Sequence, residues 1–229
     1  MNTVVAEFEK VSRETYDKFI EESGFDKSKF VDYDDIKIPA RSTKGSAGYD
    51  FYSGMEYDYL DDSVVRKCYD VMYEARKCVE LLISNYSINF LNGRHILIPT
   101  FIKCNMNFTP VYNDSNWVLI LAPKSGIGSK TGMRLSNTIG IIDSDYYNNP
   151  DNEGHILLDI TYDPISYGSE KHLIEGEQIY TFYGRPSLVV EKNQKLVQGF
   201  FVPFGTAAND RENKNFVERT GGFGSTGLN

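Results

Sequence analysis

The stretch SNTIGIIDSDY, residues 136–146, runs an apolar segment into two aspartates and a tyrosine. Asp143 follows an Ile-Ile pair that is expected to be buried, so its carboxylate is expected to be partly desolvated and placed to take a proton from water. A strand that simply ends in an Asp-rich turn would show the same pattern. The stretch therefore predicts either a general base at Asp143 or an ordinary strand end.

Two further stretches combine charge with glycine. In APKSGIGSK, residues 122–130, backbone N–H groups, the Ser125 hydroxyl and the Lys124 ammonium could converge on phosphate oxygens. A plain surface loop is the alternative for that segment. In SAGYDF, residues 46–51, Asp50 follows a glycine and an aromatic residue at the entrance to a strand.

The segment GGFGSTG, residues 221–227, lies close to the end of the printed chain. The Phe223 ring could stack on a base, the glycines let backbone N–H groups approach phosphate, and Ser225 and Thr226 add hydroxyls. A disordered tail is the common alternative for a glycine-rich segment. The composition predicts a lid that becomes ordered on a nucleotide.

The elements that must position these groups are mainly strands. Short runs rich in Ile, Val, Tyr and Phe are separated by Pro, Gly, Asn and Asp. The runs are ILIPTFIKCNMNF, WVLILAP, TIGIID, HILLDITY, QIYTFYG and KLVQGFFVPF. Their spacing predicts a mainly β fold, either a sandwich or a jelly roll.

Two segments show helical periodicity instead. Apolar residues recur every three or four positions across residues 62–84, behind the capping-type sequence DDS, which predicts an inserted amphipathic helix. A weaker pattern that ends near Gly24 predicts a short N-terminal helix. Its apolar positions are Phe8, Val11, Thr15, Phe19 and Ile20.

Composition argues against several classes of function. A net charge of −8 and a pI near 5.0 disfavour sequence-independent binding of nucleic acid. The three cysteines, Cys68, Cys78 and Cys104, lack metal-ligand spacing and fit reduced thiols in a cytosolic compartment. Neither a signal sequence nor an 18-residue apolar span is visible, so we expect a protein that is neither secreted nor embedded in a membrane.

Together with KNQKLVQGFFVPF, these stretches resemble the five motifs of the trimeric deoxyuridine triphosphatase (dUTPase) family, in the family's order. AGYDF resembles the first motif, PKSG the second, NTIGIIDSDY the third, QKLVQGFFVP the fourth and GGFGSTG the fifth. The resemblance implies a jelly-roll (β-clip) subunit, a homotrimer with shared active sites, and hydrolysis of dUTP to dUMP and pyrophosphate.

The resemblance also implies roles for individual residues. Asp143 would orient and deprotonate the attacking water, and Tyr146 would lie under deoxyribose and leave no room for a 2'-hydroxyl. Phe223 would stack on uracil from a neighbouring subunit's tail, and Asp50 would act through water on Mg²⁺ bound to the triphosphate. The other implied substrate-binding residues are Asn137, Ile141 and Ile142 at the uracil edge, Lys124, Ser125, Gly126 and Gln198 at the phosphates, and Arg219, Gly224, Ser225 and Thr226 in the fifth motif.

Some positions depart from the family pattern. Lys124 and Lys195 stand where the second and fourth motifs usually have arginine, which keeps the charge but loses the bidentate fork. Glu218 occupies the usual arginine position of the fifth motif, and Arg219 follows one residue later, within reach of a phosphate from a flexible segment. The turn YNNPDNEG after Tyr146 is longer than usual.

Residues 1–229 are predicted to form a single dUTPase-like domain with a flexible C-terminal lid at 209–229. Insertions are expected at about 55–95 and 163–187. They could bind a protein partner, thicken the trimer or only cover apolar surface. Such insertions suit a phage-encoded or otherwise divergent enzyme. The expected location, from the reduced thiols, is the cytoplasm, that of the host if the enzyme is phage-encoded.

Two other functions are compatible with this pattern. A deoxycytidine triphosphate deaminase shares the fold, but the intact IDSDY sequence and Phe223 favour the hydrolase. A nucleotide-sensing interaction protein could act through the insertions, although the retained Asp143 argues against a binder without catalysis.

Overall fold

The computed structural model describes residues 4–58, 95–106, 117–162, 166–174, 177–184, 189–209 and 221–222. Strands make up most of the regular structure in this part of the chain, so the prediction of a mainly β fold is confirmed. The helix predicted at 62–84, with Cys68 and Cys78, lies outside the described residues.

A five-stranded sheet carries most of the predicted motifs. Its order is β2-β3-β14-β7-β9, with antiparallel pairing throughout. In its central row, Asp50 pairs with Gln198, and Gln198 pairs with Ala122. The strands are β2 (Ala40–Arg41), β3 (Tyr49–Tyr52), β14 (Lys195–Pro203), β7 (Trp117–Pro123) and β9 (Gly140–Ile142).

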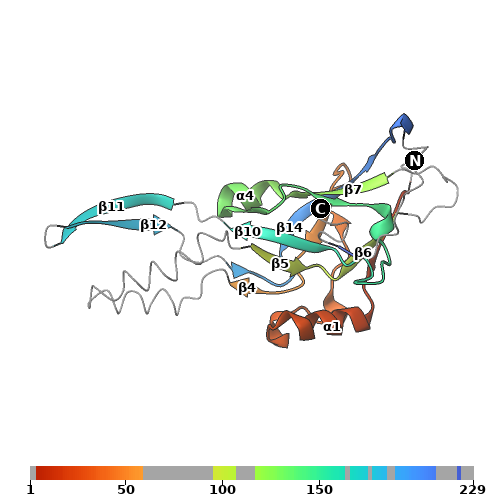
Figure 1. Ribbon diagram of the computed structural model, residues 1–229, viewed down its shortest axis with the longest axis horizontal. Helices are drawn as coiled ribbons and strands as arrows, with labels where there is room; N and C mark the ends of the chain where they lie inside the picture. Colours follow the sequence, from red (N-terminus) through yellow and green to blue (C-terminus); the bar gives the residue numbers. More distant parts are fainter. Residues whose placement is uncertain are drawn as a thin grey trace.

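Smaller sheets complete the body of the fold (Figure 1). A three-stranded sheet has the order β5-β10-β8, from β5 (His95–Pro99), β10 (Leu157–Tyr162) and β8 (Met133–Leu135). Two pairs join distant parts of the sequence: β1 (Glu7–Lys10) with β6 (Ile102–Asn105), and β13 (Val189–Val190) with β4 (Tyr57–Asp58).

Two long strands lie within the segment predicted as the second insertion. β11 (Ser166–Ile174) and β12 (Glu177–Gly184) form an antiparallel pair of their own. Among the described strands they pair with nothing else, and Figure 1 shows this ribbon extending away from the other sheets. The insertion boundaries themselves remain predictions.

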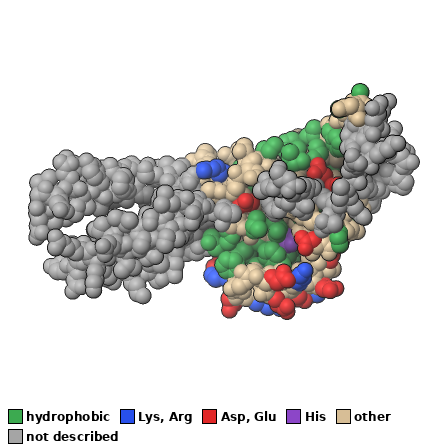
Figure 2. All heavy atoms as spheres, viewed as in Figure 1, with side chains coloured by type: hydrophobic (Ala, Val, Ile, Leu, Met, Phe, Trp, Pro, Cys, Tyr) green, Lys and Arg blue, Asp and Glu red, His purple; other side chains and the backbone are tan. Residues whose placement is uncertain are grey.

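The predicted N-terminal helix is present as α1 (Arg13–Ser23), and it ends at Gly24 with φ 73° as expected of a glycine cap. It buries Tyr16 and Ile20. In Figure 1 the helix lies at the lower edge, and in the same view Figure 2 shows acidic and basic side chains along that edge. The expected start was wrong, because Phe8 lies on β1 opposite Cys104. None of the described helices is long and apolar enough to cross a membrane.

The segment predicted as a phosphate-binding turn folds differently from the expectation. Residues after Lys124 form the short helix α4 (Ser125–Thr131), which ends at Gly132 with φ 82°. Within the described residues, single-turn 3-10 helices also lie at Lys27–Lys29, Tyr33–Asp35 and Ser144–Tyr146. The last of these, η3, follows β9 directly and carries Tyr146.

The run ILIPTFIKCNMNF contains two strands instead of one, because the chain bends at Phe101, where φ is 56°. The Phe101 N–H donates to His155 Nε2 (3.0 Å), and the two rings stack at 5.2 Å. Burial lowers the pKa of His155 to about 3, so the ring is neutral and can accept this bond. Cys104, also buried, is a free thiol whose pKa burial raises to about 12.

Candidate active site

A pocket of about 320 Å³ lies between β9 and the β8–β10 pair. Its walls include residues of the 136–142 segment, a turn that leads into β9. Thr138 lies in this turn in the left-handed region, with φ 67°. Four residues predicted at the base and sugar line the pocket: Asn137, Ile141, Ile142 and Tyr146. The structure therefore brings together the base- and sugar-contacting residues expected from the third motif.

Tyr146 forms a fixed wall of this pocket, and its side chain is only 5% exposed. Its hydroxyl donates to the His155 carbonyl (2.9 Å) and accepts from Asn152 Nδ2 (2.9 Å). Gly222 also lines the pocket, and a Cβ on this residue would lie 3.0 Å from the Tyr146 hydroxyl oxygen. The described part of the tail thus reaches Tyr146 of its own chain, and glycine permits this close approach.

Asp143 stands between β9 and η3, directly after the pocket residue Ile142. The expectation of a desolvated carboxylate was wrong: Asp143 is exposed, and Ile141 before it is 55% exposed. The reason is topological, since β9 is the end strand of its sheet in the described chain and pairs with β7 alone. The carboxylate is therefore accessible to water and to a ligand at the pocket.

A second polar group is centred on Asp50, which is 1% exposed. Its Oδ1 accepts from Lys124 Nζ (2.9 Å) and Gln198 Nε2 (3.3 Å). Its Oδ2 accepts from the Ser42 hydroxyl and pairs with Lys195 Nζ at 2.7 Å. Burial raises the pKa of Asp50, but these hydrogen bonds together outweigh burial and hold the pKa well below its ordinary value.

Sequence reasoning anticipated only part of the Asp50 group. Asp50, Lys124 and Gln198 come from three different motifs, and the sheet register brings them together. Lys195 was noted only as an arginine replacement, and Ser42 lies in no motif. No local pattern points to Ser42, because its contact with Asp50 depends on the pairing of β2 with β3. Ser125 and Gly126 follow Lys124 at the start of α4.

The Asp50 carboxylate does not fit a metal ligand in this geometry. A carboxylate offers about four lone-pair positions, and the donors Lys124, Gln198, Ser42 and Lys195 occupy them. A magnesium-bound water would have to displace one of these donors. Within the described ranges, no group of three or more His, Cys, Asp or Glu side chains could hold a metal ion. The expected action of Asp50 on Mg²⁺ stays a prediction.

The Asp50 group and the pocket lie at different places on the five-stranded sheet. Asp50 is on β3, whereas β9 lines the pocket. These two strands are three strand spacings apart, which is about 14 Å. Within one chain, the Asp50 group and the pocket are therefore separate.

Most of the fifth motif lies outside the described residues. This applies to Arg219, Phe223, Gly224, Ser225 and Thr226, so their predicted roles remain predictions. Within 209–229, the predicted lid, residue 209 and the pair 221–222 are described. Gly221 is buried and Gly222 is half-buried.

The size and the apolar lining of the pocket suit a small molecule with a flat ring. The chain belongs to the deoxyuridine 5'-triphosphate nucleotidohydrolase (dUTPase) family. It is 34% identical over 192 residues to that enzyme of Lactococcus lactis subsp. lactis, which covers 84% of this chain and 89% of the relative. The predicted family is confirmed.

Other similarities are more distant. The dUTPase of Shewanella sediminis is 28% identical over 191 residues, 83% of this chain and 86% of the relative. Among solved structures, dUTPase from Streptococcus mutans has 23% identity and a TM-score of 0.49, covering 87% of this chain and 97% of that one. The dUTPase from phage phi11 of S. aureus has 18% identity and a TM-score of 0.47, covering 90% and 93%. No family model matches the chain.

Proposed function

We propose that this chain hydrolyses dUTP to dUMP and pyrophosphate. The observation that carries the proposal is the pocket walled by the 136–142 segment and Tyr146, with the exposed residue Asp143 directly after Ile142. The relatives named deoxyuridine 5'-triphosphate nucleotidohydrolase support the same reaction.

The pocket would bind the nucleoside part of the substrate. Its volume and apolar lining suit a pyrimidine ring, and the backbone of the 136–142 segment would offer polar groups to the base edge. Gly140 lets β9 lie close to β7, because a Cβ there would lie 3.2 Å from the Leu121 Cβ. The fixed Tyr146 ring would lie under deoxyribose and exclude a 2'-hydroxyl.

Asp143 would act as the general base. Its exposure lets it hold a water molecule at the rim of the pocket. The water oxygen would bond to the α-phosphorus while the bridging P–O bond breaks, the electron pair would leave with pyrophosphate, and the carboxylate would take the water's proton. The reaction needs no further reactant.

Lys124 and Lys195 would face the phosphates, held in place by Asp50 between them. Because Asp50 on β3 and the pocket at β9 are three strand spacings apart, about 14 Å, we propose that each active site combines residues from different subunits of a homotrimer. Residues 219–226 would close over the bound nucleotide. Dependence on Mg²⁺ and a cytoplasmic location are further parts of the proposal. A protein partner is one of three roles open to the insertions, beside thickening the trimer and covering apolar surface.

The test is pyrophosphate release from dUTP, dCTP, UTP and dTTP, with and without magnesium, by wild type, Asp143→Asn and Asp145→Asn. Asp145 is an exposed aspartate in the same short turn and is the matched control. Asp143→Asn should bind nucleotide normally but turn over roughly 10²-fold more slowly, the scale of a positioned general base, while Asp145→Asn stays near wild type.

Three outcomes would contradict the proposal. Wild-type protein that releases no pyrophosphate from dUTP is not a dUTPase, and ammonia release from dCTP would identify a deaminase instead. Equal turnover in wild type and Asp143→Asn would remove Asp143 from the mechanism.

A further inference from the structure

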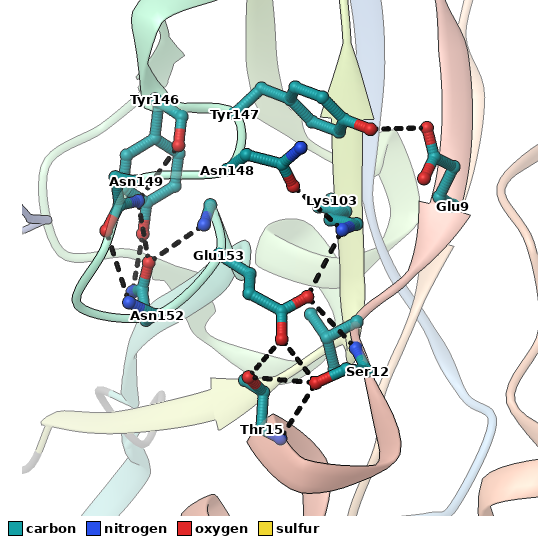
Figure 3. A network of polar contacts seen from close by, with 12 residues as sticks. Glu9, Ser12, Thr15, Lys103, Tyr146, Tyr147, Asn148, Asn149, Asn152 and Glu153 are labelled. Carbon is teal, nitrogen blue, oxygen red and sulfur yellow. Dashed lines mark hydrogen bonds and ion pairs between the residues drawn. The ribbon is translucent and has the colours of Figure 1, made fainter.

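The turn after Tyr146 holds this pocket residue from two sides (Figure 3). Asn152 Nδ2 donates to the Tyr146 hydroxyl (2.9 Å), and Asn149 Nδ2 donates to the Tyr146 carbonyl (2.9 Å). We infer, on the basis of the proposed function, that Asn152 is a positioning residue for sugar selection, and that Glu153 anchors its turn to the N-terminal helix.

The turn has an unusual backbone. Asn148 and Glu153 adopt left-handed conformations with φ 55° and 59°, and Gly154 follows with φ 80°. At Gly154 a Cβ would lie 2.5 Å from the Tyr146 carbonyl oxygen, so this position requires glycine. Left-handed non-glycine residues persist where surrounding contacts determine them. The turn is therefore wrapped tightly around the backbone of Tyr146.

Asn152 connects the turn's internal bonds to the pocket. Its Oδ1 accepts from Asn149 Nδ2 (2.9 Å) and from the Gly154 N–H (3.0 Å). These two bonds orient the amide so that Nδ2 is directed at the Tyr146 hydroxyl. Because that hydroxyl also donates to the His155 carbonyl, both its donor and an acceptor position are engaged. The tilt of the ring that walls the pocket is thus determined by polar contacts as well as by packing.

Glu153 ties the turn to a distant part of the sequence. Its carboxylate accepts from the backbone N–H of Ser12 (3.1 Å), from the hydroxyls of Ser12 and Thr15, and from Lys103 Nζ (3.1 Å). Ser12 is the N-cap of α1, where a negative charge is favourable. Burial raises the pKa of Glu153, but these hydrogen bonds outweigh burial and lower the pKa to about 2. The anchor is therefore charged at neutral pH.

Further contacts hold the turn against the β1–β6 pair. The Tyr147 hydroxyl donates to Glu9 on β1 (2.8 Å), and Lys103 on β6 donates to Asn148 Oδ1 (2.8 Å). Lys103 also lies over the Tyr147 ring, 5.2 Å from its centroid. The N-terminal segment and its partner strand β6 thus brace the turn that orients Tyr146.

The variant Asn152→Asp tests this role with little change of shape. Aspartate keeps the Oδ1 acceptor of the turn but replaces the donor to Tyr146 with an oxygen. Asn148→Asp is the matched control, because it adds the same charge to the same turn, keeps an acceptor for Lys103 and does not contact Tyr146. Both variants are made in wild type and in Tyr146→Phe, and are measured for kcat and KM with dUTP and with UTP, and for melting temperature.

In the wild-type background, Asn152→Asp should narrow the preference for dUTP over UTP by about threefold to tenfold, the scale of one hydrogen bond. In Tyr146→Phe, the same substitution should narrow the preference for dUTP over UTP no further, since the hydroxyl is already absent. Asn152→Asp should likewise lower the melting temperature of wild type more than that of Tyr146→Phe. Asn148→Asp should keep the wild-type preference.

The outcomes separate the inference from the proposed function. Wild-type protein that does not hydrolyse dUTP overturns the proposed function, and the inference with it. An active wild type whose nucleotide preference survives Asn152→Asp overturns the inference alone. If Asn152→Asp changes the preference for dUTP over UTP equally in wild type and in Tyr146→Phe, the inference is also overturned, because Asn152 would then act only through the stability of the turn.

Discussion

Replacing Asp50 by asparagine separates two roles for this carboxylate. In the structure Asp50 is a buried counter-ion shared by Lys124 and Lys195. Asparagine keeps the shape and an acceptor oxygen but removes the negative charge, so both ammonium groups lose their partner. If Asp50 instead served mainly to hold magnesium-bound water, stability would not depend on its charge.

The magnitude follows from burial. Removing one partner of a buried ion pair costs about 3–5 kcal/mol. The side chains of Lys124 and Lys195 are 30% and 41% exposed and can regain water, so the lower end applies, about 3 kcal/mol. For a chain of this size, that corresponds to a fall in melting temperature of about 6–12 °C.

The assay is a thermal melt at pH 7 of wild type, Asp50→Asn and Asp151→Asn, with dUTP hydrolysis measured across a magnesium titration. Asp151 is an exposed aspartate and serves as the control for loss of one charge. A double variant with Lys195→Met should recover part of the lost stability, because one unpaired ammonium is removed. A melting temperature equal to wild type, together with a higher magnesium requirement, would refute the counter-ion argument and support the metal role.

Two more predictions concern acid stability and subunit sharing. The folded-state pKa of His155 is about 3 against an ordinary 6.5, so below pH 6.5 the unfolded chain binds a proton that the folded chain does not, and stability falls. In urea, the free energy of unfolding should fall by about 2 kcal/mol between pH 6.5 and pH 5, a range above that in which Glu153 protonates. A free energy of unfolding that does not change over this range would show that His155 can take up a proton in the folded protein. If sites are shared, mixing Asp143→Asn subunits with subunits truncated after Val217, followed by reassembly, should yield activity that neither variant has alone. Mixtures as inactive as their parents would mean that each chain closes its own site.

The sequence by itself determined the elements whose signals are local. Short runs rich in Ile, Val, Tyr and Phe, separated by turn residues, predicted a mainly β chain, and the glycine cap at Gly24 marked the end of α1. The order of the five motifs was enough to predict the dUTPase family, which the Lactococcus relative confirms. These features were accessible because each depends on residues that are close together in the chain.

Tertiary structure decided what depends on partners far away in the sequence. Phe8 fits a helical pattern, but pairing of β1 with β6 places it on a strand. Asp143 follows two isoleucines, yet it is exposed because β9 ends its sheet. Ser42 and Lys195 meet Asp50 only through strand register, and Glu153 reaches Ser12 across 141 positions. Such contacts are set by sheet order and chain packing, and side-chain type alone does not encode them.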